Sequence, residues 1–324
     1  MKNKELNSLS EIGKILSKSK SILIFPHGSI DGDALGSSVA LCLGLRSLGK
    51  ICYVMMDEDI PENIRFIENG CCNWDLNYIT DQDVSICIDN GELSRIYSRQ
   101  DLFKKGKTSA LIDHHKSSEP FLDYNYIDIK AAASAEIIFD LLLVMGIKIT
   151  KEIAEAIYVG IVTDTGRFQY SNTTKRTHEI VSELMDYDID QNKVSVEIYQ
   201  SVSHAKIKLE ACVLNTLRVE CEGRLAAAYV TRKMLSETGA KDEDTEGVVE
   251  IMRNLRGVEV AVFAKEKEQD EIKVSMRSKF DFDVSQIAVD FQGGGHVNAA
   301  GFSCHGDIEK IVSEVMDEIK KKMK

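Results

Sequence analysis

Aspartate and histidine residues follow directly after several apolar segments of this chain. The residues concerned are His27, Asp31, Asp33, Asp89, Asp113, His114, His115 and Asp164. Burying such side chains costs free energy unless an opposite charge or hydrogen bonds compensate them. A cluster of divalent metal ions provides that compensation, because carboxylates and imidazoles are common metal ligands. The pattern therefore indicates a metalloenzyme.

The segments that must position these residues alternate between strands and helices. We predict strands at 21–25, 51–55, 84–88 and 108–112, and helices at 6–16, 32–48, 131–145 and 151–162. This alternation is typical of α/β folds with a parallel sheet. Ligands of such sheets bind beyond the carboxyl ends of the strands, where these aspartates and histidines fall.

The chain pattern changes towards the C-terminus. We predict a first domain over residues 1–187, a polar linker or connecting helix over 188–205, and a smaller α/β domain over 206–324. The predicted elements of the second domain are strands at 225–230, 258–264 and 271–277, a charged turn around 268–270, and helices at 283–291 and 308–319. We expect the active site to lie in the cleft between the two domains.

Composition restricts the partners. The 324 residues carry 40 Lys and Arg against 52 Asp and Glu, a formal charge of −12, without a visible basic stripe. A protein that grips long nucleic acid neutralises many phosphates with basic residues, so we expect short anionic substrates and no long duplex. No apolar stretch approaches the roughly 18 residues of a membrane span. The eight cysteines lack CxxC spacing, which favours reduced thiols and a cytoplasmic protein without membrane contact.

Each motif also has an ordinary explanation when it is taken alone. Asp31 and Asp33 flank Gly32 in a turn that opens a helix, and Asp89 precedes Asn90-Gly91, which is a common turn sequence. Asp164 ends a predicted helix shortly before Gly166. The coincidence of all these motifs at the ends of apolar segments favours the metal cluster.

The ordered set of motifs resembles the DHH family of phosphoesterases. The segment 27–33 (HGSIDGD), the lone Asp89, the triplet 113–115 (DHH) and Asp164 match the catalytic domain of that family. The segments 275–278 (SMRS) and 293–301 (GGGHVNAAG) resemble its DHH-associated C-terminal domain. Within the family the chain is most similar to bacterial nanoRNase-type members, which degrade very short oligoribonucleotides and dephosphorylate 3′-phosphoadenosine 5′-phosphate.

The resemblance implies two divalent metal ions, with Mn²⁺ preferred and Mg²⁺ or Co²⁺ as substitutes. One ion would be held by His27, Asp31 and Asp89, and the other by Asp33, Asp89, His114 and Asp164. Asp89 would then bridge the ions. A pair of metals about 3.5–4 Å apart activates water and holds the oxygens of a phosphoryl group.

The resemblance also implies roles for residues that do not bind the metals. His115 would face the substrate phosphate as a hydrogen-bond or proton donor, and Asp113 would orient an imidazole. The substrate-binding residues of the second domain would be Arg277, Ser278, Gly293, Gly294, Gly295 and His296. Consecutive glycines let backbone amides approach a phosphate, and an arginine pairs with it in a planar fork. The ordinary alternatives are a flexible loop and an exposed strand charge.

The predicted function is hydrolysis of short single-stranded RNA and dinucleotides to mononucleotides, together with release of the 3′-phosphate of phosphoadenosine phosphate. A manganese pyrophosphatase, a phosphodiesterase for cyclic or linear dinucleotides and a single-strand exonuclease remain alternatives. The last would need an additional DNA-binding domain for which the chain has little room. A nucleotide-binding regulator without activity should have lost a metal ligand, whereas every motif position is filled here. A homodimer also stays open.

Overall fold

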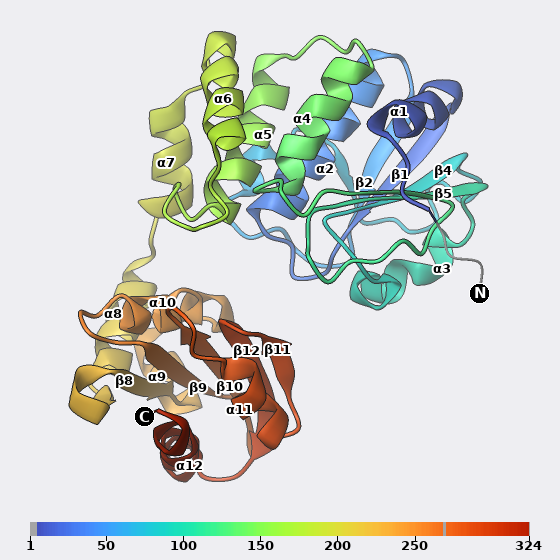
Figure 1. The fold of residues 1–324 in the computed structure, drawn as a ribbon. Helices are drawn as coiled ribbons and strands as arrows, with labels where there is room; N and C mark the ends of the chain where they lie inside the picture. The colour runs from blue at the N-terminus through green and yellow to red at the C-terminus, as the bar shows by residue number, and fades with distance from the viewer. Residues whose placement is uncertain (1–4, 268–269, 324) are drawn as a thin grey trace. The chain divides into compact units, whose positions relative to one another are not determined.

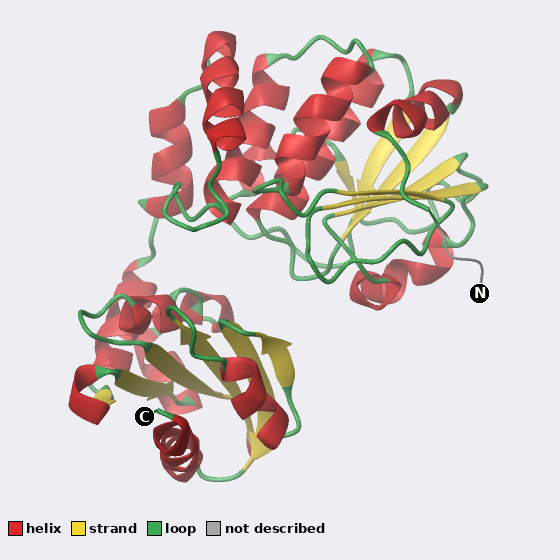
Figure 2. Cartoon of the chain, viewed as in Figure 1, coloured by secondary structure: helices red, strands yellow, loops and turns green. Residues whose placement is uncertain are grey.

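The computed structural model describes residues 5–267 and 270–323. The chain divides into two compact units, Met1–Ser201 and Val202–Lys324, each built of helices and a sheet (Figures 1 and 2). The division falls within the segment 188–205. Helix α7 (Gln191–Tyr199) occupies part of that segment, and its Val194 is buried in the core of the first unit. Within the described residues, no helix is both long and apolar enough to cross a membrane.

The first unit contains a parallel sheet of six strands. Its strands are β1 (Ser21–Pro26), β2 (Ile51–Met55), β3 (Cys72–Asn73), β4 (Val84–Ile88), β5 (Thr108–Asp113) and β6 (Tyr124–Ile127). Their order is β3-β2-β1-β4-β5-β6, and every neighbouring pair is parallel. The predicted parallel α/β sheet is therefore confirmed. The edge strands β3 and β6 were not predicted, because they are too short to show a pattern.

Helices cover both faces of this sheet (Figure 1). They are α1 (Leu9–Lys18), α2 (Gly32–Ser47), α3 (Gln100–Phe103), α4 (Ser134–Val144), α5 (Lys151–Asp164), α6 (Lys175–Leu184) and α7. In β1, Ile22 and Ile24 enter the core beneath α2, α4 and α5, whereas Phe25 packs edge-on against Phe103 of α3. Burial on both faces explains why the strands appear in the sequence as continuous apolar runs.

Helices α2 and α5 pack backbone against backbone. A Cβ atom on Gly36 would lie 2.3 Å from the carbonyl oxygen of Ala156, and one on Gly160 would lie 2.8 Å from Oδ1 of Asp33. Glycine is therefore required at both positions, because a larger residue would push the helices apart. The close approach brings Asp33, in the first turn of α2, next to the last turns of α5.

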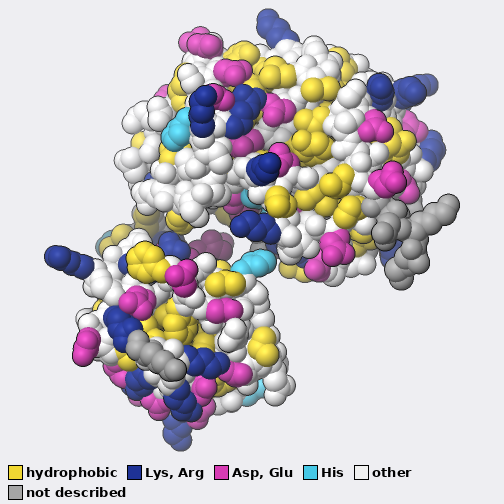
Figure 3. Space-filling model, viewed as in Figure 1, with side chains coloured by type: hydrophobic (Ala, Val, Ile, Leu, Met, Phe, Trp, Pro, Cys, Tyr) yellow, Lys and Arg dark blue, Asp and Glu magenta, His cyan; other side chains and the backbone are white. Residues whose placement is uncertain are grey.

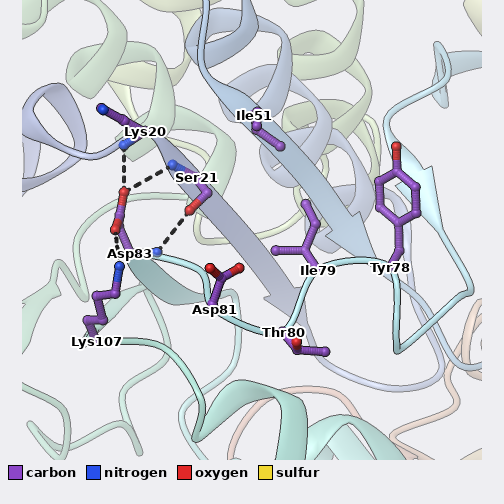
Figure 4. A pocket seen from close by; sticks show the side chains of 9 residues that line it. All are labelled: Lys20, Ser21, Ile51, Tyr78, Ile79, Thr80, Asp81, Asp83 and Lys107. Carbon is purple, nitrogen blue, oxygen red and sulfur yellow. Dashed lines mark hydrogen bonds and ion pairs between the residues drawn. The ribbon is translucent and has the colours of Figure 1, made fainter.

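A pocket of about 430 Å³ lies at the opposite edge of the sheet, where the strands begin (Figure 4). Its lining residues are Lys20, Ser21, Ile51, Tyr78, Ile79, Thr80, Asp81, Asp83 and Lys107. The carboxylate of Asp83 accepts hydrogen bonds from the backbone N–H of Lys20 and the ammonium group of Lys107, both at 2.8 Å. These bonds tie together the loops that lead into β1, β4 and β5.

The second unit contains a mixed six-stranded sheet. Its strands are β7 (Arg218–Glu220), β8 (Leu225–Val230), β9 (Val260–Glu266), β10 (Glu271–Ser278), β11 (Gly294–His296) and β12 (Ala299–His305), in the order β11-β12-β10-β9-β8-β7. Only β8 and β9 pair in parallel within the described residues. Residues 268 and 269 of the predicted charged turn lie outside the described residues.

Helices also cover both faces of the second sheet. They are α8 (His204–Leu214), α9 (Arg232–Thr238), α10 (Val248–Arg253), α11 (Val284–Asp290) and α12 (Ile308–Lys322). Helices α11 and α12 pack on one face, and α8, α9 and α10 pack on the other. The predicted smaller α/β domain is confirmed. The glycine-rich segment, for which a flexible loop was the ordinary alternative, forms the edge strand β11, paired with β12.

Candidate metal centre

The predicted metal ligands of the first unit come together beyond the carboxyl ends of β1, β4 and β5. The chain leaves β1 and β4 towards different sides of the sheet, and ligands of parallel sheets bind at such switch points. Three groups of side chains have potential ligand atoms within 4.8 Å of one another: His27 with Asp31 and Asp89, Asp33 with His114 and Asp164, and Asp89 with His114 and His115.

Asp89 stands at the centre of these groups. Its Oδ2 lies 3.4 Å from Nε2 of His27, and its Oδ1 lies 3.4 Å from Nε2 of His114. The residue is 2% exposed, and its backbone has a left-handed φ of 55°. Such a conformation is uncommon for a residue other than glycine and is often found at functional sites. The two oxygens of one carboxylate thus face two different groups of ligands.

The remaining distances agree with ligands that share an ion. Nε2 of His27 is 3.5 Å from Asp31, and Nε2 of His114 is 3.8 Å from Asp33 and 3.7 Å from Asp164. When two ligand atoms each lie about 2.1 Å from the same ion and the ligand–metal–ligand angle is about 90–110°, the two atoms are roughly 3–3.5 Å apart. The distances between histidine and carboxylate atoms therefore lie within a few tenths of an ångström of this range. The donor set fits two divalent ions.

Electrostatics at the cluster also favour added positive charge. Burial alone would lower the pKa of His27 and His114, but the neighbouring carboxylates outweigh it and raise both values to about 10. Burial and the charge of Asp89 raise the pKa of Asp33 well above its usual range. Burial likewise raises the pKa of Asp164, to about 6. A divalent cation would supply the positive charge that these side chains lack.

The N-terminus of α4 supports the cluster from behind. The backbone N–H groups of Ser134 and Ala135 donate to Asp33 at 2.6 and 2.9 Å, and the Ser134 hydroxyl donates to Oδ1 of Asp89 at 3.0 Å. A helix N-terminus stabilises negative charge, so α4 offsets part of the cost of burying these carboxylates. Sequence reasoning missed Ser134, because it follows three alanines inside a predicted helix and no spacing marks it.

The two histidines of the triplet have different surroundings. Nδ1 of His115 lies 2.7 Å from Oδ1 of Asp113, which is fully buried and also accepts a hydrogen bond from the Ser118 hydroxyl. The bond to Asp113 raises the pKa of His115. Nδ1 of His115 also lies 3.5 Å from Asp89, which explains the third group of ligand atoms. Because Asp113 already holds this nitrogen, the geometry favours His114 as the ligand.

Asn172 is a second residue that the sequence did not reveal. Its side-chain amide donates to the carboxylate of Asp164 at 3.3 Å and to the carbonyl oxygen of Ala132 at 2.9 Å. It therefore links the end of α5 to the segment that precedes α4. Its sequence context, 171–174 (SNTT), is typical of an ordinary polar turn and carries no signal of this contact.

In the second unit, Arg277 and His296 lie in one row across three strands. Both are paired in register with Ala299 of the strand between them, so their side chains emerge on the same face of the sheet. Adjacent strands lie about 4.8 Å apart, which places the two backbones roughly 10 Å apart. Arg277 makes an ion pair with Glu250 of α10 at 3.2 Å, whereas His296 is exposed.

The other predicted substrate-binding residues serve the fold in part. A Cβ atom on Gly293 or Gly295 would lie 2.3 or 2.5 Å from a carbonyl oxygen of β12, whereas Gly294 has open space. Ser278 is 4% exposed, and its hydroxyl donates to the carbonyl oxygen of Phe282 at 2.6 Å. The hydroxyl thus supports the neighbouring loop, and its contact with substrate stays a prediction.

Comparison with known proteins covers both units. Residues 21–161 match the DHH family, N-terminal domain, and residues 222–323 match the DHHA1 domain. The bifunctional oligoribonuclease and PAP phosphatase NrnA of Thermus thermophilus is 30% identical over 93% of this chain and 90% of its own length. The protein of the same name from Bacillus subtilis is 27% identical over 94% of this chain and 97% of its own length.

A solved structure is similar as well. The crystal structure of an exopolyphosphatase-related protein from Bacteroides fragilis has a TM-score of 0.91 and 29% identity, and it covers 97% of this chain and 95% of its own. The sequence similarity extends over nearly the full length of the relatives, and both family domains follow one another in the expected order. The chain therefore belongs to the DHH family of phosphoesterases, which are hydrolases of phosphoester bonds.

Proposed function

We propose that this protein hydrolyses very short oligoribonucleotides to mononucleotides and removes the 3′-phosphate of 3′-phosphoadenosine 5′-phosphate. The observation that carries the proposal is the position of Asp89, whose two oxygens face His27 and His114 at 3.4 Å each. Asp89 would bridge two divalent ions, one held with His27 and Asp31 and the other with Asp33, His114 and Asp164. The mixture of carboxylates and imidazoles suits Mn²⁺, with Mg²⁺ or Co²⁺ as substitutes.

When bound, such ions activate water and stabilise charge on the phosphoryl oxygens. The chain itself contributes a proton donor. The hydrogen bond from Nδ1 of His115 to Asp113 keeps a proton on Nδ1, so Nε2 is the ring nitrogen that would face the substrate. The hydrogen bond to Asp113 raises the pKa of His115, which favours a proton on Nε2 that the ring can give to the leaving oxygen. Asp113 acts here as a positioning residue.

The second unit would contribute substrate contacts. Arg277 offers a planar guanidinium group to a phosphate, for which the substrate would compete with Glu250. His296 and the exposed backbone at Gly294 lie in the edge strand β11, which β12 separates from the strand of Arg277, and they would add further hydrogen bonds. These contacts act on the substrate as a whole and not on the metals.

Two further observations support short substrates in particular. The relatives from Thermus thermophilus and Bacillus subtilis are named for oligoribonuclease and PAP phosphatase activities, and the similarity extends over both of their domains. The net charge is −12, and acidic and basic side chains are interspersed on the face shown in Figure 3. A long nucleic acid would need a continuous basic surface. The eight free cysteines support a cytoplasmic location.

The test is a substrate panel with the purified protein in Mn²⁺. It comprises a diribonucleotide, phosphoadenosine phosphate, pyrophosphate and a cyclic dinucleotide, each with and without EDTA. We expect metal-dependent turnover of the first two and much slower turnover of the others. Preferential hydrolysis of pyrophosphate or of the cyclic dinucleotide would replace the proposed function with the corresponding alternative.

A further inference from the structure

Phe280 in the second unit has an unusual conformation for an aromatic residue. Its side chain is 79% exposed, the highest value among the exposed large apolar side chains of the described residues. Its backbone has a left-handed φ of 58°, which is unfavourable for a bulky side chain. Burial does not compensate either cost, because the ring points into solvent. Strain that persists at an exposed residue suggests a role in function.

A network of hydrogen bonds holds this conformation in place. The side-chain amide of Asn298 donates to the carbonyl oxygen of Phe280 at 2.8 Å and to the hydroxyl of Ser278 at 3.0 Å. The same hydroxyl donates to the carbonyl oxygen of Phe282 at 2.6 Å. The backbone N–H of Val284 donates to the carbonyl oxygen of Val297 at 2.8 Å. Both ends of the loop are therefore fixed, and Phe280 is presented by a rigid support.

The same network ties the loop of Phe280 to the elements that carry the candidate phosphate-binding residues. Ser278 directly follows Arg277 in β10, and Asn298 lies in the turn that follows His296 and the strand β11. The elements joined by this network carry a guanidinium group, an imidazole and an exposed aromatic ring. A nucleotide presents the complementary set, namely a phosphate and a flat heteroaromatic base.

We propose that Phe280 is a stacking platform for a nucleobase of the substrate. The inference rests on the proposed function and adds a base-binding subsite to it. Stacking on an aromatic side chain tolerates every base, because each base has a π-face. This suits an enzyme that must accept short RNAs of any sequence. The buried Ser278 then has a clear purpose, since it helps to hold the loop that presents the ring.

The experiment compares three substitutions of Phe280 in the full-length protein with Mn²⁺. Phe280→Trp keeps an aromatic ring, Phe280→Leu keeps only apolar volume, and Phe280→Asn removes both while tolerating the left-handed backbone. For a diribonucleotide, we expect KM to rise roughly tenfold in the Leu and Asn variants and to stay near the wild-type value in the Trp variant. The value of kcat should change little, because stacking is present in both the ground and transition states.

A matched substrate separates base stacking from other effects. The probe is a dinucleotide in which one base is replaced by an abasic ribose, tested at each of its two positions. For the abasic substrate that lacks the stacked base, the wild-type protein should have a high KM, and Phe280→Leu should not change that KM. An equal rise in KM for both abasic substrates and the intact dinucleotide would overturn the proposal. Wild-type KM in the Leu variant would also overturn it.

Folding is controlled by thermal unfolding of the same variants. Phe280→Asn should unfold at the wild-type temperature or above it, because asparagine accepts a positive φ more readily than phenylalanine. A weaker substrate interaction in a variant of unchanged stability then reports the ring itself. Failure of the wild-type protein to turn over any dinucleotide would reject the proposed function. Turnover that is unaffected by all three substitutions would reject only the stacking role.

Discussion

The candidate metal centre of the first unit and the proposed substrate-binding residues of the second unit are built in opposite ways. At the metal centre, Asp33 and Asp89 are 1% and 2% exposed and receive hydrogen bonds from α4. In the second unit, His296 and Phe280 are exposed, and hydrogen bonds of Ser278 and Asn298 support the loop of Phe280. The fold must position hydrogen-bond partners around a buried charged group. An exposed side chain that contacts substrate needs only a backbone that is held in place. Substitutions should therefore affect metal binding in one region and substrate affinity in the other.

The largest expected effect is at Asp89. Asp89→Asn should lower turnover at least about a thousandfold, because one neutralised oxygen disturbs both groups of ligands. Calorimetric binding of Mn²⁺ should be lost together with turnover, while the circular dichroism spectrum stays unchanged. Asp101→Asn, at an exposed carboxylate of α3, is the matched control and should behave as wild type. Near-normal turnover of the Asp89 variant would contradict the two-metal assignment.

The adjacent histidines test whether the metal centre and the proton donor are separate. His114→Ala should lower the metal content of the purified protein, whereas His115→Ala should retain the metals and lose turnover by about a hundredfold or more. Elemental analysis and kinetics of both variants provide the measurement. Equal metal loss in the two variants would favour the ligand group that contains His115.

The second unit should respond differently to substitution. We expect Arg277→Ala or His296→Ala to lower kcat/KM for a dinucleotide and for phosphoadenosine phosphate by roughly ten- to a hundredfold, with metal content unchanged. Hydrolysis of a small generic phosphodiester should be almost unaffected. Lys273→Ala removes an exposed charge from the same face of β10 and serves as the control. A proportional loss on all substrates would show that these residues act in catalysis or folding.

A smaller effect is expected where the packing of α5 against α2 positions Asp33. Gly160→Ala places a methyl group near Asp33 and Ala135, and it should lower the free energy of unfolding by about 1–3 kcal/mol and weaken Mn²⁺ binding. Gly44→Ala meets the flexible end of Leu142 at 2.5 Å and the side chain of Ile147 at 3.5 Å, and it should leave Mn²⁺ binding unchanged. Urea unfolding and calorimetry of both variants measure the two effects. Equal metal affinity of the two variants would show that the Asp33 side chain is not held by this contact.

The smallest effect lies at the amino ends of the strands, outside both regions. The ammonium group of Lys107 and the backbone N–H of Lys20 lower the pKa of Asp83 from 3.8 to about 2. The folded-state pKa is depressed, so the stabilisation is present above about pH 4 and is lost as the pH falls towards 2. Asp83→Asn should cost about 1 kcal/mol at pH 6 and progressively less below pH 4. Urea titrations of both proteins at pH 6, 4 and 3 measure the difference, which should leave turnover at pH 7 unchanged.

The local sequence was sufficient to predict the element order, the parallel sheet and the residues of the candidate metal cluster. Strands buried on both faces must be continuously apolar, and residues that end such strands meet at one edge of a parallel sheet. These relations need only neighbouring residues, so His27, Asp89 and His114 were found from the spacing of apolar runs. The short strands β3 and β6 were missed, because two and four residues hold too little periodicity.

Tertiary structure alone decided the contacts between residues far apart in the chain. The hydrogen bond from Ser134 to Asp33 joins residues 101 positions apart, and no sequence pattern near either residue predicts it. Asp89 turns one oxygen towards His27 and the other towards His114 from a left-handed backbone, which the apolar run before it does not determine. The burial of Ser278 and the bond from its hydroxyl to the carbonyl oxygen of Phe282 were likewise not visible in the sequence. The chain sequence selects which groups are available, and packing selects which of them face one another.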